Sequence, residues 1–175
     1  MAIGGDISGQ RLAVGEGTAF EGVLLRNAGR KPAVLESVRI VGLTDGFEVL
    51  GVRTRPWPAS PETYASDPQR FALTGAGPAV LDGSPVLPVS TAGSRPGHSE
   101  NAVQLAIGAR AVAPGVARAR GVEIRYRVGH HRYRRSTDAS MYLCAPPERF
   151  TTERSCPGDA EDRFASVFVD YPASR

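Results

Sequence analysis

Residues 121–133 carry the sequence GVEIRYRVGHHRY, and this stretch decides the fold class. Apolar and charged residues alternate in it, which is typical of a strand with one buried and one solvated face. The residues on the apolar side are Val122, Ile124, Tyr126 and Val128. Gly129-His130 predicts a two-residue turn of type II′, because glycine takes the first central position. Residues 131–143 are then expected to return as the antiparallel partner strand.

The rest of the chain is built from similar short runs, while helical periodicity is nearly absent. The clearest runs are residues 18–26, 33–43, 47–54 and 101–108. Asp45-Gly46 between two of them predicts a further hairpin, and Val86-Leu87 is expected to touch the core. Strands without long crossover connections pair antiparallel, and two stacked sheets bury their apolar faces.

We therefore expect an all-β protein, an antiparallel β-sandwich of seven to nine strands. The sandwich is assigned to residues 1–144, and residues 145–175 form a C-terminal extension with one candidate strand at 163–171. Residues 55–68 hold four prolines, which predicts a long loop rather than a central strand.

Composition narrows the class of protein. The chain has 175 residues, enough for one domain with a substantial core. A formal net charge of +3 is far below that of a basic nucleic-acid-binding tail. Lys31 is the only lysine. The preference for arginine reflects either codon usage in a GC-rich genome or selection for guanidinium groups that grip carboxylate or phosphate. No apolar run has the length of a membrane span.

Two cysteines, Cys144 and Cys156, lie close together in the sequence without metal-ligand spacing. We expect them to form one disulfide that pins the C-terminal segment to the end of the sandwich. Two free buried thiols are the alternative. A disulfide implies an oxidising compartment, although the chain opens without a signal sequence. The expectation is an extracytoplasmic or cell-surface protein whose export segment has been removed; otherwise the protein is cytoplasmic and the disulfide is absent.

Residues 15–54 and 101–144 resemble the immunoglobulin-like and fibronectin-like domains of exported bacterial proteins. The resemblance rests on the strand before Asn27-x-Gly29, on Pro32 and the alternating strand after it, and on the hairpin that runs to Leu143-Cys144. That hairpin is similar to the closing hairpin of small extracytoplasmic β-sandwich domains of high-GC bacteria. The Cys…Trp…Cys spacing of antibody domains is absent. The resemblance implies an Ig-like fold and a surface binding or structural module, and it implies no catalytic residues.

The predicted hairpin places like charges opposite each other. Arg127 faces Arg132, and Arg125 faces Arg134, which is unfavourable unless anions intervene. Either these arginines bind an anionic partner, or acidic residues of neighbouring strands and solvent relieve the repulsion. This register also turns Arg135 inward, a conflict that a bulge near Arg134-Arg135 would remove.

Aromatic and histidine residues supply the other candidates. Trp57 and Tyr64 lie in the proline-rich segment and predict a binding loop, unless Trp57 folds back over a sheet edge. Nucleic acid is disfavoured as a partner, because Tyr126 and Tyr133 are expected to face the core, where they cannot stack on bases. The only candidate metal cluster is His130, His131 and His98. Adjacent strand residues point to opposite faces, so exposed turn histidines are the simpler interpretation.

Two functions follow from these residues. The first is a non-enzymatic binding or structural module, without a cofactor, whose partner is a protein or an anionic polymer at the cell surface. The second is a metal-binding protein or hydrolase with a sandwich fold that uses His130, His131 and His98. The chain contains none of the HExxH, Walker A, EF-hand or G-x-S-x-G motifs.

Overall fold

The computed structural model describes residues 1–4, 7–57, 86–87, 89, 102–150 and 156–157. These residues form the strands β1 to β11 and one short 3-10 helix, η1 (Pro147–Arg149). The all-β expectation is confirmed. The expected number of seven to nine strands is not, because the described residues alone hold eleven.

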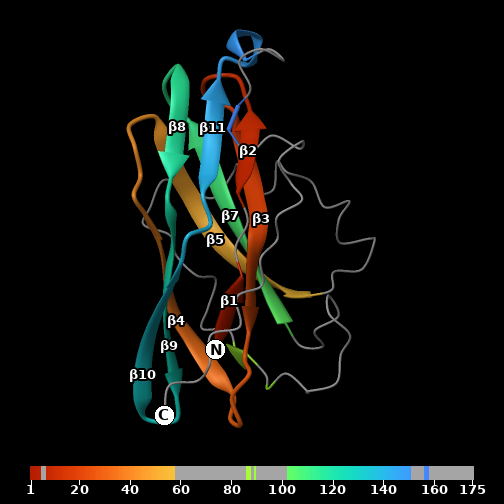
Figure 1. Ribbon diagram of the computed structural model, residues 1–175, viewed down its shortest axis with the longest axis vertical. Coiled ribbons are helices and arrows are strands. Elements are labelled where there is room, and N and C mark those ends of the chain that lie inside the picture. The colour runs from red at the N-terminus through yellow and green to blue at the C-terminus, as the bar shows by residue number, and fades with distance from the viewer. Residues whose placement is uncertain (5–6, 58–85, 88, 90–101, 151–155, 158–175) are drawn as a thin grey trace.

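The described strands form three sheets (Figure 1). Sheet A has the order β1 (Ala2–Gly4), β3 (Gly17–Arg26), β7 (Ala102–Ala111) and β5 (Phe47–Trp57). Sheet B has the order β2 (Ser8–Arg11), β11 (Met141–Ala145) and β8 (Gly115–Ala119). Sheet C has the order β10 (His131–Thr137), β9 (Gly121–Val128), β4 (Ala33–Val41) and β6 (Val86–Leu87). Neighbouring strands pair antiparallel except β2 and β11, which are parallel.

Sheets B and C are joined by one long hairpin. Strand β8 continues into β9 after a single residue, Arg120, and β10 continues into β11 after residues 138–140. In Figure 1, β8 and β11 lie directly above β9 and β10. The two arms approach closely where they bend, because a Cβ on Gly121 would lie 2.2 Å from the carbonyl oxygen of Thr137. The expected partner strand at residues 131–143 is therefore present, but it is divided into two.

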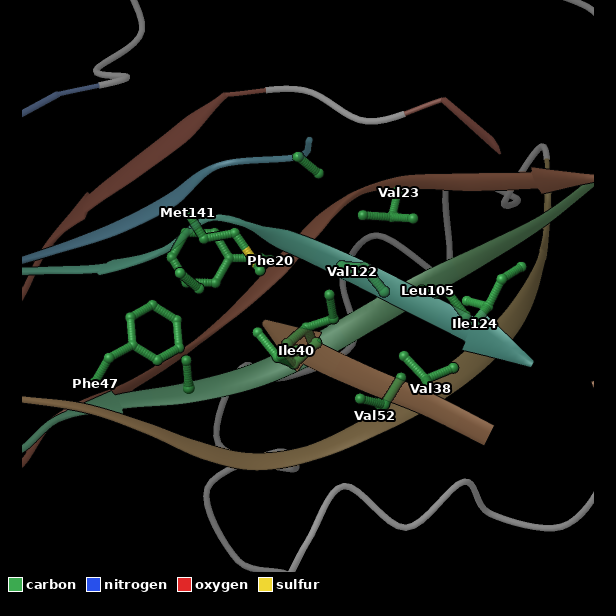
Figure 2. Close-up of a cluster of buried hydrophobic side chains, with 14 of the residues drawn as sticks. Phe20, Val23, Val38, Ile40, Phe47, Val52, Leu105, Val122, Ile124 and Met141 are labelled. Carbon is green, nitrogen blue, oxygen red and sulfur yellow. The ribbon is translucent and has the colours of Figure 1, made fainter. Parts of the chain in front are cut away.

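The core lies where sheet A meets the other two sheets (Figure 2). The side chains that sheet A contributes include Phe20, Val23, Phe47, Val52 and Leu105. Those from sheets B and C include Val38, Ile40, Val122, Ile124 and Met141. The apolar side predicted for residues 121–128 thus faces the core. Leu87 in β6 is also fully buried, so the expected core contact of Val86-Leu87 is confirmed.

Three β-bulges interrupt the regular ladders. The register shifts between Phe20 and Val23 in β3, between Leu35 and Ser37 in β4, and between Val49 and Gly51 in β5. Each bulge adds one residue to its strand, so successive inward side chains there are three positions apart and stay on the core face while the strand bends. The side-chain amide of Gln104 in β7 donates a hydrogen bond to the backbone carbonyl of Glu21, which lies inside the bulge of β3.

The hairpin expected at Asp45-Gly46 is wrong. Gly46 does adopt a positive φ of 89° and the chain does turn there. However, the strands on either side belong to different sheets: β4 pairs with β9, whereas β5 pairs with β7. The backbone of this turn makes hydrogen bonds with distant segments. Thr44 N donates to Arg118 O, and Val112 N donates to Gly46 O. Long-range pairing has therefore overridden the local turn signal.

The proline-rich segment begins later than expected. Strand β5 extends through Pro56 to Trp57, which pairs with Ala102. Pro56 is tolerated because β5 is the last strand of sheet A, where a missing backbone N–H does not break an inner ladder. The remaining residues of the expected loop and the candidate strand at 163–171 lie outside the described residues.

The C-terminal segment is fastened to sheet B. The sulfur atoms of Cys144 in β11 and Cys156 lie at disulfide-bonding distance, and both residues are buried. The expected pairing is confirmed. Gly9 in β2 lies directly beneath this segment, because a Cβ there would be 2.1 Å from the carbonyl oxygen of Pro157. Only glycine permits so close an approach of the two backbones.

Reduction of the disulfide should lower the free energy of unfolding by roughly 3 kcal/mol, the loop-closure contribution of a ring this size. Urea denaturation with and without a reductant measures the effect. The double variant Cys144→Ala, Cys156→Ala is the control and should not respond to the reductant. An equal response of both proteins would contradict the expectation.

Gly9→Ala should lower the free energy of unfolding by about 1–3 kcal/mol, because the added methyl group overlaps Pro157. Gly51→Ala is a matched control, since a Cβ at Gly51 meets nothing within 4 Å. Equal urea midpoints for the two variants would show that the Gly9 contact carries no stability.

Candidate functional site

The hairpin of β9 and β10 has the predicted register. Arg132 pairs with Arg127, and Arg134 pairs with Arg125. Gly129 has a φ of 59°, the positive value that glycine supplies at the first central position of a tight hairpin turn. We call Arg125, Arg127, Arg132 and Arg134 the arginine patch. Their side chains retain between 42% and 80% of their full exposure, so they are open to solvent and ligands.

Glu36 bridges the first facing pair of arginines. It is the extra residue of the bulge in β4, between Leu35, which pairs with Tyr126, and Ser37, which pairs with Arg125. Its Oε1 lies 3.5 Å from Nε of Arg127 and 3.4 Å from Nε of Arg132. The bulge thus directs a carboxylate between two guanidinium groups that would otherwise repel each other.

Glu123 bridges the second facing pair. It lies on the outward side of β9, as predicted, yet its side chain is only 7% exposed. Its Oε2 is 2.5 Å from Nη2 of Arg134, and its Oε1 is 3.7 Å from Nε of Arg125. One acidic residue of the neighbouring strand β4, Glu36, and one of β9 itself, Glu123, therefore reduce the repulsion.

This relief is incomplete. Four guanidinium groups share two carboxylates, so the six side chains together keep two positive charges. Beside them lies an open depression of about 660 Å³. It is lined by Glu36, Ser37, Arg125, Arg132, Tyr133 and Arg134. The arrangement can bind an anionic group by charge-assisted hydrogen bonds from fork-shaped donors.

Two expectations about β10 are wrong for the same reason. Tyr126 is buried at 4% exposure, but Tyr133 is 45% exposed although their rings stack with centroids 5.2 Å apart. Arg135 is also exposed, and it pairs with Ile124 without any register shift, so no bulge is present there. Because β10 is the edge strand of sheet C, its inward side extends past the core into solvent. The argument against base stacking therefore applies to Tyr126 alone.

The other sequence candidates do not join the arginine patch. Trp57 ends β5 in sheet A, and this end of β5 lies across the molecule from β10 in Figure 1. Tyr64 and His98 lie outside the described residues. His130 and His131 are exposed at the turn of the hairpin. Within the described part of the chain, no three side chains of histidine, cysteine or acidic type gather as a metal site would require. The metal or hydrolase hypothesis stays a prediction.

Comparison with known proteins does not place the chain in a family. No protein-family model matches it, and no curated protein matches it. The Ig-like resemblance therefore stays a prediction. Among the described residues, no helix combines the length and the hydropathy that crossing a bilayer demands.

The sequence does indicate the bulge that holds Glu36, although a strict alternation of apolar and polar residues does not reveal it. The buried residues of β4 are Ala33, Leu35, Val38 and Ile40. The spacing of three between Leu35 and Val38 breaks the period of two and marks the bulge. For Glu123 the outward position was predicted, but its role as the counter-ion of Arg134 depends on the side-chain geometry of the neighbouring strand.

Glu123→Gln should lower the free energy of unfolding by about 1 kcal/mol more than Glu36→Gln. Glu123 is the more buried carboxylate, and its loss leaves Arg125 and Arg134 facing each other without a charge between them. Urea denaturation at low ionic strength measures the difference. Adding salt should reduce it, because mobile ions screen the exposed arginines. Equal stabilities at low salt would contradict this account of Glu123.

Proposed function

We propose that the protein is a non-enzymatic binding module that holds an anionic partner on the arginine patch. The single observation that carries the proposal is the ratio of charges on the β9–β10 hairpin: two carboxylates serve four exposed guanidinium groups. An anion that enters the open depression beside them would neutralise the remaining positive charge of the arginine patch.

The surrounding fold suits such a module. Strands β9 and β10 hold the arginines on a paired ladder whose inward side is anchored by buried Val122 and Ile124. Binding therefore costs little backbone entropy, because the arginine positions are set before the partner arrives. We further propose that the three sheets form an Ig-like β-sandwich. The single core between sheet A and the other two sheets supports that architecture.

We propose an extracytoplasmic or cell-surface location. The Cys144–Cys156 pair supports it, because disulfides persist in oxidising compartments and are rare in the cytosol. In that setting the partner is a protein or an anionic polymer that the module meets outside the cytoplasm.

Arg127→Glu combined with Arg132→Glu should weaken retention on immobilised heparin and shift elution to lower salt. The change replaces two positive charges beside Glu36 with two negative ones. Arg26→Glu combined with Arg149→Glu is the control with the same change in net charge. These two exposed residues lie in sheet A and in η1.

Glu36→Gln provides the opposite arm of the same experiment. It removes a competing carboxylate from the patch and should shift elution to higher salt. Circular dichroism checks that every variant keeps its strand content. If both double variants elute together, retention follows net charge alone and the arginine patch is not the binding site.

A further inference from the structure

Within the part of the chain that the structure describes, one side of the β10 backbone has no partner strand. Strand β10 stands first in sheet C, and among the described residues β9 is its only partner strand. In a hairpin closed by two residues, the pair that flanks the turn exchanges backbone hydrogen bonds, and such pairs alternate along the ladder. Here that pair is Val128 and His131. It follows that Arg132 and Arg134 point their N–H and C=O groups away from β9.

The same two residues carry side chains of the arginine patch. Arg132 and Arg134 are 80% and 69% exposed, and both lie on the outer face of sheet C. Each alternate position of the free edge thus offers one backbone donor, one backbone acceptor and one guanidinium group. An added strand would find hydrogen-bonding groups and positive charge at the same spacing.

Charge decides what kind of strand fits. If β10 of a second copy paired antiparallel with this edge, arginines of one copy would face basic residues of the other, and like charges opposite each other destabilise a ladder. A segment with acidic residues at every second position avoids this conflict. Its carboxylates would lie on the outer face beside Arg132 and Arg134, where the patch retains two uncompensated charges.

We propose that β10 accepts an extended acidic segment of a partner protein as an added antiparallel strand. The segment carries Asp or Glu at alternate positions, and its acidic residues are those whose backbone groups face β10. This inference rests on the proposed function and deepens it, because it names the partner as a protein and the mode of binding as strand addition. Affinity comes from the backbone, and selectivity from the charges.

The probe is a blocked seven-residue peptide of alternating Glu and Thr. Its control is an isomer of identical composition in which the Glu residues are consecutive, so that they cannot share one face of a strand. We expect the alternating peptide to bind at least tenfold more tightly in a fluorescence-anisotropy titration. Arg132→Glu with Arg134→Glu should abolish the binding, whereas Arg26→Glu with Arg149→Glu should not.

Backbone methylation separates strand addition from simple charge attraction. N-methylation of the Glu residues blocks the amides that face β10 and should weaken binding at least tenfold. N-methylation of the Thr residues blocks amides that point away and should change affinity less than twofold. In amide hydrogen exchange, the N–H groups of Arg132 and Arg134 should become protected only when the peptide is bound.

The outcomes distinguish this inference from the function on which it rests. If both methylated peptides bind equally, or if the Arg132 and Arg134 amides stay unprotected, strand addition is overturned. If heparin or anionic vesicles bind through the patch while no peptide does, the partner is a polymer or a membrane surface, and the inference is again overturned. If charge reversal of the patch changes the binding of none of these probes, the proposed function itself fails.

Discussion

The register between β9 and β10 is the constraint on which the other features depend. Because side chains alternate with a period of two, a slip of one residue would send Ile124 into solvent and Arg125 into the core. The turn at Gly129-His130 prevents the slip at one end of the ladder. At the other end the hairpin continues as β8 and β11 with the register shifted by one residue, since Thr137 pairs with Val122 whereas Met141 pairs with Ala119. The turn thereby positions the facing residues of β9 and β10 in sheet C.

That register creates an electrostatic conflict, and two carboxylates resolve half of it. The arginines face each other because the apolar residues of β9 point inward, which turns Arg125 and Arg127 outward beside their partners in β10. The bulge in β4 supplies Glu36 to one arginine pair, and β9 itself supplies Glu123 to the other. The remaining charge is a property of the hairpin that no described residue neutralises. It is the reason for treating this surface as a binding site and not only as a solvated face.

The sequence predicted the parts of the structure that depend on local pattern. The strand periods, the turn at Gly129-His130 and the Cys144–Cys156 pair were all readable from neighbouring residues. The hairpin at Asp45-Gly46 was not, because whether a turn joins paired strands depends on partners far along the chain. The edge position of β10 could not be predicted either: Tyr133 fits an inward pattern, yet it is exposed because β9 is the one neighbour of β10 among the described strands. The bulges were recoverable, since Leu35 and Val38, like Val49 and Val52, are three residues apart and both pack at the core.

The parallel pair of β2 and β11 has a consequence for the order of folding. Strands β3 to β10 lie between them in the chain, so β2 waits until all of these have been synthesised before its partner β11 is available. Contacts of such long sequence separation form slowly, because the entropy of closing a large loop is lost before the contacts contribute any stabilisation. Sheet B should consequently be the last region to mature. The Cys144–Cys156 disulfide, which fastens the segment above Gly9, would then form after the other sheets have folded. A chain that has not completed this step would have β2 without its partner strand.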